Sequence, residues 1–207
     1  MPLKITTKPL LLETLKIENG VITNLPYHQA RCDRSRHAIY GTTQTLELQT
    51  QIIPPPTGVY RCRVLYAQRI HSIEYIPYIP PKFSSLKIIT SDIDYPYKYA
   101  NRDALNTLLS AHETYDDIII TKEGYLTDTS IANIAFYDGK RWLTPQKPLL
   151  QGTMRQKLID EGFLQPKQIK EEEIPNYSHV ALMNAMLGFK ILNDITIYDN
   201  KGKCYDY

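Results

Sequence analysis

The segment from residue 98 to residue 155 constrains this chain more than any other part of it. Lys98 lies between two tyrosines, after a strand-like run and before a helical pattern. Asp128 lies further along, in a Thr-Asp-Thr-Ser run inside an otherwise apolar strand pattern. Gly152 then follows a proline-containing loop and opens a second helical pattern. This order predicts a chain that mixes short strands with helices.

The same three residues suit a phosphorylated aldehyde cofactor. An amine forms a Schiff base with the aldehyde, a carboxylate holds a pyridine nitrogen protonated, and the N–H groups of a helix N-terminus bind the phosphate. Each residue also has a plainer interpretation. Lys98 suits a surface lysine, Asp128 a turn or edge-strand aspartate, and Gly152 an ordinary helix start. Taken one by one, the residues leave both interpretations open.

Length and composition exclude several classes of function. A chain of 207 residues suits one compact domain or two small lobes. The net charge of +2 is too small to indicate a nucleic acid or an anionic membrane as partner. No apolar run approaches the ~20 residues that span a bilayer, and the N-terminus lacks the pattern of a signal peptide. Three widely spaced cysteines without a CxxC pair argue against a zinc or redox site. We therefore expect a cytoplasmic protein.

Local patterns predict the elements. Asn19-Gly20 predicts a tight hairpin turn, and residues 26–40 predict a basic helix with Pro26 in its first turn. Pro80-Pro81 predicts a linker between a small lobe, residues 1–80, and a larger lobe, residues 84–207. We expect later helices at 100–113 and 152–162, and strands at 59–68, 71–80, 86–92, 116–121, 125–130, 133–138, 140–145, 178–186, 189–192 and 195–199.

Three segments, KYANR, GYLTDTSIAN and GTMR, resemble those of the class IV aminotransferases, the fold-type IV pyridoxal-phosphate enzymes. The resemblance extends from about Leu12 to Met186. It implies an α+β fold with a small N-terminal α/β lobe and a larger C-terminal pseudo-barrel lobe, like that of D-amino acid aminotransferase. It also implies pyridoxal 5'-phosphate (PLP) as the cofactor, bound between the lobes, and a homodimer.

The resemblance also assigns roles to residues. It makes Lys98 the Schiff-base lysine, and it sets Asp128 against the pyridine nitrogen, where the family more often has glutamate. Arg31 in the segment HQAR, which by itself also suits a solvated helical arginine, becomes a phosphate ligand. His28 of the same segment suits a helix-start or packing residue. The further phosphate contacts implied are the backbone amides of Thr153 and Met154 and the late loop at Asn184 and Ala185.

Within the family, KYANR and MNAM are most similar to the aminodeoxychorismate lyases. Thr14, in LETLK, lies where those lyases carry a hydroxyl residue that assists elimination, although it also suits an outward-facing strand threonine. The resemblance therefore implies removal of pyruvate from 4-amino-4-deoxychorismate, which gives 4-aminobenzoate for folate synthesis, with aminodeoxychorismate synthase upstream.

Two departures weaken the inference about substrate. Lys16 stands where an arginine is common, and the usual Gly-Asp-Gly segment is missing near the N-terminus. Two alternatives therefore stay open. One is a transaminase acting on a branched-chain or D-amino acid. The other is a cofactor-binding protein without turnover.

Overall fold

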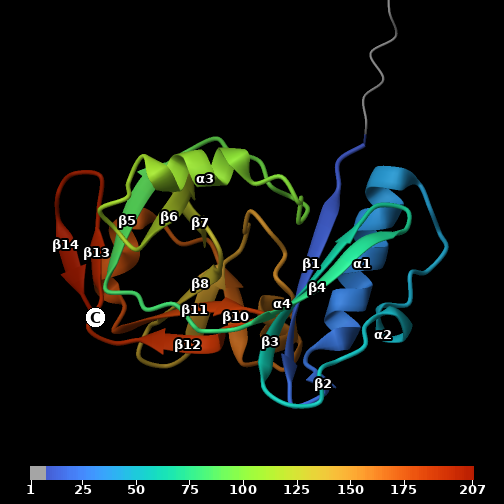
Figure 1. Cartoon of the computed structure of the whole chain (residues 1–207). Coiled ribbons are helices and arrows are strands. Elements are labelled where there is room, and N and C mark those ends of the chain that lie inside the picture. The colour runs from blue at the N-terminus through green and yellow to red at the C-terminus, as the bar shows by residue number, and fades with distance from the viewer. Residues whose placement is uncertain (1–7) are drawn as a thin grey trace, which may run out of the picture. The chain divides into compact units, whose positions relative to one another are not determined.

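A four-stranded antiparallel sheet and one long helix form the first of two compact units. This computed structural model describes residues 8–207 (Figure 1). Residues 1–7 lie outside the described residues. They belong to the predicted small lobe and to the N-terminus that is predicted to lack a signal peptide. The sheet has the strand order β2-β1-β3-β4. The elements of this unit are β1 (Leu11–Glu18), β2 (Val21–Ile22), α1 (Leu25–Tyr40), α2 (Leu48–Gln51), β3 (Val59–Tyr66) and β4 (Ile70–Pro77).

The hairpin and the helix that follow each other here form where the sequence predicts them. Asn19 and Gly20 both have positive φ angles, 48° and 80°, as the two central residues of a type I′ turn require. Pro26 lies in the first turn of α1, and the helix ends where Gly41, at a φ of 70°, donates its N–H to the His37 carbonyl. Both predictions are confirmed.

Helix α1 carries more buried charge than a solvated basic helix would. Arg36 is buried, and its guanidinium donates to the backbone carbonyls of Gln44, Ala67 and Gln68 at 2.6, 3.3 and 2.7 Å. One arginine thus orders the loop after α1 and the turn between β3 and β4. The core beneath the helix consists of buried residues from β1, α1, β3 and α2 with its C-cap residue: Leu11, Leu15, Ile17, Cys32, Leu48, Ile52, Cys62, Val64 and Tyr66.

Residues 97–101 group with this first unit, although they fall within the predicted larger lobe, residues 84–207. The Ala100 N–H donates to the Leu10 carbonyl at 2.9 Å, which joins the segment to the chain just before β1. The remaining boundary lies between Tyr78 and Ile79, close to the predicted Pro80-Pro81 linker. Proline content marks a linker, but it carries no information about a segment that returns through long-range backbone pairing.

The second unit contains residues 79–96 and 102–207 and is built on a ten-stranded sheet. Its main path has the order β10-β9-β8-β7-β6-β5-β13-β14, with β11 paired to β8 and β12. The pairs β5–β6, β5–β13 and β9–β10 are parallel. Its elements are β5 (Ser85–Thr90), α3 (Asp103–Ser110), β6 (Asp117–Lys122), β7 (Tyr125–Thr129), β8 (Asn133–Tyr137), β9 (Trp142–Pro145), α4 (Thr153–Asp160), β10 (Leu164–Lys167), the 3₁₀ helix Glu171–Asn176, β11 (His179–Asn184), β12 (Gly188–Leu192), β13 (Thr196–Tyr198) and β14 (Cys204–Asp206).

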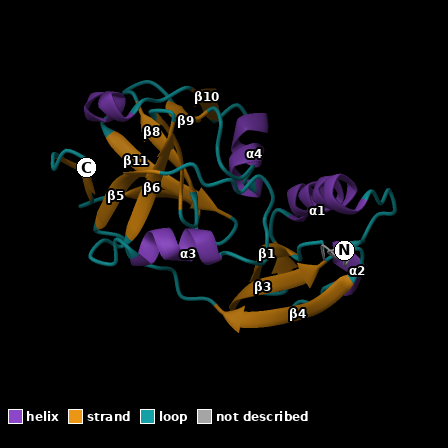
Figure 2. Cartoon of the chain, turned by 90° about the horizontal axis from the view of Figure 1, so that it is seen from above, coloured by secondary structure: helices purple, strands orange, loops and turns teal. Residues whose placement is uncertain are grey.

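Helices α3 and α4 lie beside this sheet, α4 against β10 and β11 (Figure 2). Helix α3 is shorter than the predicted 100–113, and two strands were not predicted. One of them, β10, contains Pro166, which a strand tolerates at the edge of a sheet, where β10 lies. The other, β14, is only three residues long. The mixture of short strands and few helices confirms the predicted α+β class.

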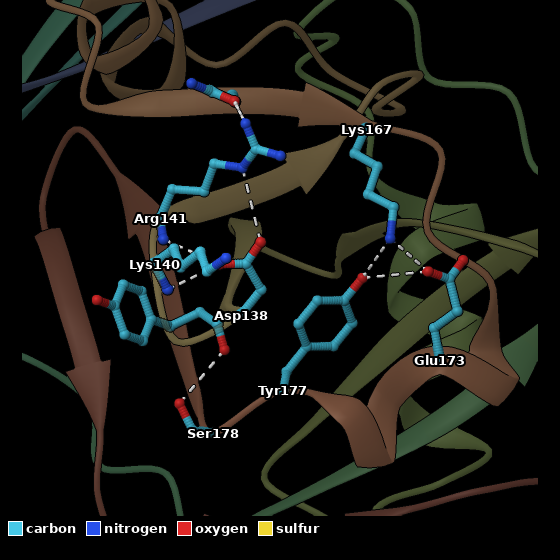
Figure 3. Close-up of polar contacts among 9 residues, drawn as sticks. Asp138, Lys140, Arg141, Lys167, Glu173, Tyr177 and Ser178 are labelled. Atoms are coloured by element: carbon cyan, nitrogen blue, oxygen red, sulfur yellow. Dashed lines mark hydrogen bonds and ion pairs between the residues drawn. The ribbon is translucent and has the colours of Figure 1, made fainter.

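Polar side chains close the turn between β8 and β9 (Figure 3). Asp138 Oδ1 accepts hydrogen bonds from the backbone N–H groups of Lys140 and Arg141, both at 2.9 Å. The Arg141 side chain then donates to Gln165 of β10 at 2.8 Å. A second group in the same view, Lys167 with Glu173 and Tyr177, ties β10 to the 3₁₀ helix. Both groups hold the edge of the sheet.

Two further features concern the cysteines and the helices. Cys32 and Cys62 are free and buried in the first unit, and Cys204 is free and exposed in β14. Among the helices of residues 8–207, none is long and apolar enough to cross a membrane.

Candidate functional site

Lys98 lies on a short extended segment of the first unit that pairs with the start of β1. The Leu12 N–H donates to the Lys98 carbonyl at 2.8 Å, and Leu11 and Tyr99 form an antiparallel bridge. The lysine is half-buried. The flanking Tyr97 and Tyr99 rings meet edge to face, with centroids 6.0 Å apart. Backbone pairing therefore fixes the position of Lys98 relative to β1.

Arg31, on α1 of the same unit, forms a forked ion pair with a carboxylate of β1. Its Nε donates to Oε1 of Glu13 at 2.8 Å, and its Nη2 donates to Oε2 at 2.6 Å. Arg31 is 6% exposed and Glu13 is fully buried. The interpretation of Arg31 as a solvated helical arginine is therefore wrong. Its role as a phosphate ligand stays a prediction.

His28, one turn earlier on α1, binds the same carboxylate. Its Nδ1 lies 2.6 Å from Glu13 Oε2, and both side chains are fully buried. Burial lowers the pKa of His28 below 6.5, against the opposing effect of Glu13, and the positive charges of Arg31 and Lys98 lower it further. The imidazole is therefore neutral, with Nδ1–H donating to the carboxylate. This contact with an ionised group goes beyond a helix-start or packing role.

Thr14 lies on the other face of β1. Successive strand residues point to opposite faces, so Glu13 faces α1 with Leu11 and Leu15 while Thr14 faces away from it. Thr14 is half-buried and is paired across the sheet with Arg63 of β3. The predicted role of its hydroxyl in elimination stays a prediction.

Asp128, on β7 of the second unit, is buried and holds the loop before α4. Its Oδ1 accepts a hydrogen bond from Asn133 Nδ2 at 2.7 Å, and its Oδ2 accepts one from the Leu150 N–H at 2.8 Å. A carboxylate offers about four lone-pair sites. Asp128 therefore retains acceptor capacity after these two bonds.

Burial raises the pKa of Asp128 from 3.8 to about 7. The hydrogen bonds from Leu150 and Asn133 and the positive charge of Arg155 oppose this rise but do not cancel it. A buried carboxyl that titrates near neutral pH accepts a proton or pairs with a cation readily. This behaviour suits a residue that faces a basic nitrogen.

Gly152, the N-cap residue of α4, is required by close packing. A Cβ at this position would lie 1.9 Å from Asn133 Oδ1. The Asn133 amide cannot easily turn away, because its Nδ2 donates both to Asp128 and to the Leu150 carbonyl, the latter at 2.9 Å. Asn133 therefore orients Asp128.

Arg155, in the first turn of α4, fixes the other end of the same loop. It is buried, its Nη2 donates to the Pro145 carbonyl at 2.9 Å, and its Nη1 donates to Gln151 Oε1 at 3.2 Å. The loop between β9 and α4 is thus held by Asp128, Asn133 and Arg155 together. The start of α4 is therefore held by hydrogen bonds from side chains to the backbone of the preceding loop.

The backbone amides of Thr153 and Met154 belong to the first turn of α4. N–H groups of a first turn point out of the N-terminal end of a helix, where they favour anions. This geometry agrees with the predicted phosphate contacts, which stay a prediction.

Asn184 and Ala185 lie at the turn between β11 and β12. Asn184 Oδ1 accepts hydrogen bonds from the N–H groups of Met186 and Leu187 at 2.9 and 2.8 Å, and its Nδ2 donates to the Ile131 carbonyl at 3.2 Å. The Asn184 side chain therefore shapes the late turn. Any contact of this turn with a phosphate stays a prediction.

The predicted residues thus form two groups, one in each unit. Lys98, Arg31 and Thr14 belong to the first, and the remaining site residues belong to the second. Sequence reasoning missed Glu13, which holds the first group together. The available signal was an acidic residue at an apolar position of an alternating strand, in the hairpin that precedes a basic helix.

Comparisons with known proteins identify the family to which this chain belongs. The family model for amino-transferase class IV matches residues 96–192. An uncharacterized protein from Haemophilus influenzae is 40% identical over 184 residues, which cover 86% of this chain and 98% of that protein.

Solved structures show the same architecture. A crystal structure from Haemophilus somnus 129PT, described as a "putative 4-amino-4-deoxychorismate lyase", has 34% identity and a TM-score of 0.79, covering 88% of this chain and 99% of its own. A hypothetical aminotransferase from Mycobacterium tuberculosis, solved in a PLP-bound form, shares the fold at 14% identity and a TM-score of 0.78, with 100% and 89% of the two chains covered. The chain belongs to the class IV aminotransferase family, and the predicted fold class is confirmed.

The contact between Gly152 and Asn133 yields a stability prediction. Gly152→Ala should lower the free energy of unfolding by ~1–3 kcal/mol, because the new methyl group overlaps the Asn133 amide. Chemical denaturation measures the loss. In an Asn133→Ala background, the same substitution should cost much less, since the overlapping oxygen is gone. Equal costs in both backgrounds would contradict the proposed contact.

The raised pKa of Asp128 yields a pH prediction for the cofactor-free protein. A carboxyl whose folded pKa lies above its unfolded value stabilises the fold at low pH, and this contribution is lost as the pH rises from about 4 to about 7. Relative to Asp128→Asn, the unfolding free energy of the parent should therefore fall by up to ~1.4 kcal/mol per pH unit across this window. Denaturant titrations at several pH values test this. A constant difference between parent and variant would be inconsistent with the raised pKa.

Proposed function

We propose that this protein binds PLP and eliminates pyruvate from 4-amino-4-deoxychorismate to give 4-aminobenzoate. The observation that carries the proposal is the H. somnus relative of that description, which is 34% identical over nearly its whole length. The proposal also includes the homodimer and the upstream aminodeoxychorismate synthase that the family resemblance implies, and the cytoplasmic location that the sequence pattern implies.

The residues of the chain fit this cofactor. PLP presents an aldehyde, a pyridine nitrogen and a phosphate, which call for an amine, a carboxylate and anion-binding groups. Lys98 is the proposed covalent attachment point. Asp128, buried and with acceptor capacity left, is the proposed partner of the ring nitrogen. The proposed phosphate ligands are Arg31, the amides of Thr153 and Met154, and the turn at Asn184 and Ala185.

The cofactor, when bound, supplies an electron sink for the carbon that carries the substrate nitrogen. Once the substrate amine has replaced it on the cofactor, the released Lys98 amine would remove the proton from that carbon. The bond from the neighbouring ring carbon to the enolpyruvyl oxygen then breaks, and its loss leaves an aromatic ring. The departing enolate takes up one proton and becomes pyruvate, so the atoms of substrate and products balance. Asp128 would hold the ring nitrogen in its protonated form.

Thr14 is the proposed source of assistance to the departing oxygen, because a hydroxyl can donate a hydrogen bond to the charge that develops there. The sheet face that carries Thr14 also carries three cations. Arg63 is paired with Glu74 and Lys16 with Glu18, while Arg61 is exposed. These charges leave one net positive charge, which suits a carboxylate of the proposed substrate.

Cofactor attachment is tested by reduction and peptide mapping. The purified protein should absorb near ~410–420 nm, as a lysine-bound PLP does. After borohydride treatment, mass spectrometry should find a phosphopyridoxyl group on Lys98. Lys98→Arg should remove the label, while the control Lys122→Arg should keep it. A label on another lysine would overturn the assignment.

The lyase reaction is tested by 4-aminobenzoate fluorescence in an assay coupled to chorismate, glutamine and the upstream synthase. Thr14→Ala should slow product formation by ~10²–10⁴-fold without changing the cofactor spectrum, because general acid assistance is lost. Thr14→Ser should keep part of the rate, and the control Thr107→Ala, on the exposed side of α3, should keep all of it.

Two outcomes of this assay favour the alternatives. If no 4-aminobenzoate forms while an amino acid is converted to its 2-oxo acid, the protein is a transaminase. If PLP binds and neither reaction occurs, it is a cofactor-binding protein without turnover.

A further inference from the structure

Glu13 is an ionised carboxylate at the centre of the first unit. It is fully buried on the face of β1 that packs against α1, between Leu11 and Leu15. Burial by itself raises the pKa of Glu13, but Arg31 and His28 lower it more strongly, to about 2. The carboxyl group of Glu13 is therefore ionised at neutral pH.

Three hydrogen bonds specify the geometry around this charge. Arg31 donates through Nε and Nη2, one to each carboxylate oxygen, and His28 donates through Nδ1 to Oε2. A forked pair holds the guanidinium in the plane of the carboxylate, which fixes the direction of its third nitrogen, Nη1. The bond from Nδ1 fixes the tautomer of His28, so that its Nε2 is an acceptor.

A buried ion pair of this kind is weak evidence for stability. Removing charges from water has a cost that can equal or exceed their mutual attraction, so apolar residues of similar size often stabilise a core as well. The arrangement therefore calls for another explanation. Its surroundings supply one, since the segment that carries Lys98 pairs with β1 directly beside Glu13.

The pKa of His28 connects the Glu13 group to Lys98. The positive charge of Lys98 is one of the causes that lower the pKa of His28. The Lys98 amine thus lies within electrostatic range of the imidazole that Glu13 orients. Both belong to the same unit.

We propose that Glu13 is a positioning residue that aligns Arg31 for a phosphate and holds His28 as a neutral acceptor beside the Lys98 segment. The inference rests on the proposed function in that the phosphate is that of PLP. Glu13 acts through its two partners rather than by touching the cofactor.

Glu13→Gln tests the alignment with almost no change in shape. A glutamine has one acceptor oxygen where the carboxylate has two, so Arg31 must lose one bond of its fork in either orientation of the amide. Titration of the cofactor-free protein with PLP, followed by equilibrium dialysis, should give an affinity ~10-fold or more below that of the parent. The control Glu18→Gln, at the exposed end of β1, should bind PLP as the parent does.

A double-variant cycle separates positioning from a general loss of structure. Glu13→Gln should have little further effect on PLP affinity when Arg31 is already alanine, because the group that it aligns is gone. A full additional loss in that background would assign Glu13 a merely structural role. If Glu13→Gln does not fold, Arg31→Lys replaces it, since lysine keeps the charge without the fork. Its affinity should then be close to that of Arg31→Ala, and parent-like affinity would overturn the proposal.

The tautomer of His28 is measured without any cofactor. Nitrogen-15 NMR of the imidazole should find a neutral ring with the proton on Nδ1 at pH 7. A ring protonated on Nε2, or a charged ring, would overturn the proposed arrangement. If the parent does not bind PLP at all, the proposed function fails and this inference with it. If the parent binds PLP and Glu13→Gln binds it equally well, only this inference fails.

Discussion

Burial of a carboxylate is the constraint on which the polar structure of both units depends. A carboxyl group removed from water must either pair with a cation or become easier to protonate. The first unit takes the first solution. Glu13 is fully buried, meets the Arg31 fork and the His28 N–H, and keeps a pKa of about 2. The second unit takes the other solution. Asp128 accepts hydrogen bonds from neutral groups, and its pKa rises to about 7.

These two solutions suit different kinds of chemistry. A permanently ionised carboxylate fixes the orientation of its partners, because the ion pair has one preferred geometry. A carboxyl that titrates near neutral pH can respond to a basic group that approaches it. The class IV family places an acidic residue at the pyridine nitrogen, and the raised pKa of Asp128 agrees with such a role. Asn133 and the Leu150 amide hold the Asp128 side chain in place.

The junction before α4 illustrates how irregular backbone is held. Asp128 and Asn133 bind the backbone of Leu150, and Arg155 binds the carbonyl of Pro145. The loop therefore gains from side chains the hydrogen bonds that a strand would gain from its neighbours. Gly152 completes the junction, because only a residue without a Cβ leaves room for the Asn133 amide.

The sequence by itself determined the local elements, the α+β class and the residue types of the candidate site. Asn19-Gly20 specifies its turn, Pro26 and Gly41 bound α1, and alternating apolar residues specify the strands, because these signals act over a few residues. Tertiary structure decided the rest. The pairing of the Lys98 segment with β1, the burial of Arg31 against Glu13 and the contact of Asn133 with Gly152 all join residues far apart in the chain. Such contacts depend on which strands pair and which side chains become buried. Short-range sequence signals specify neither.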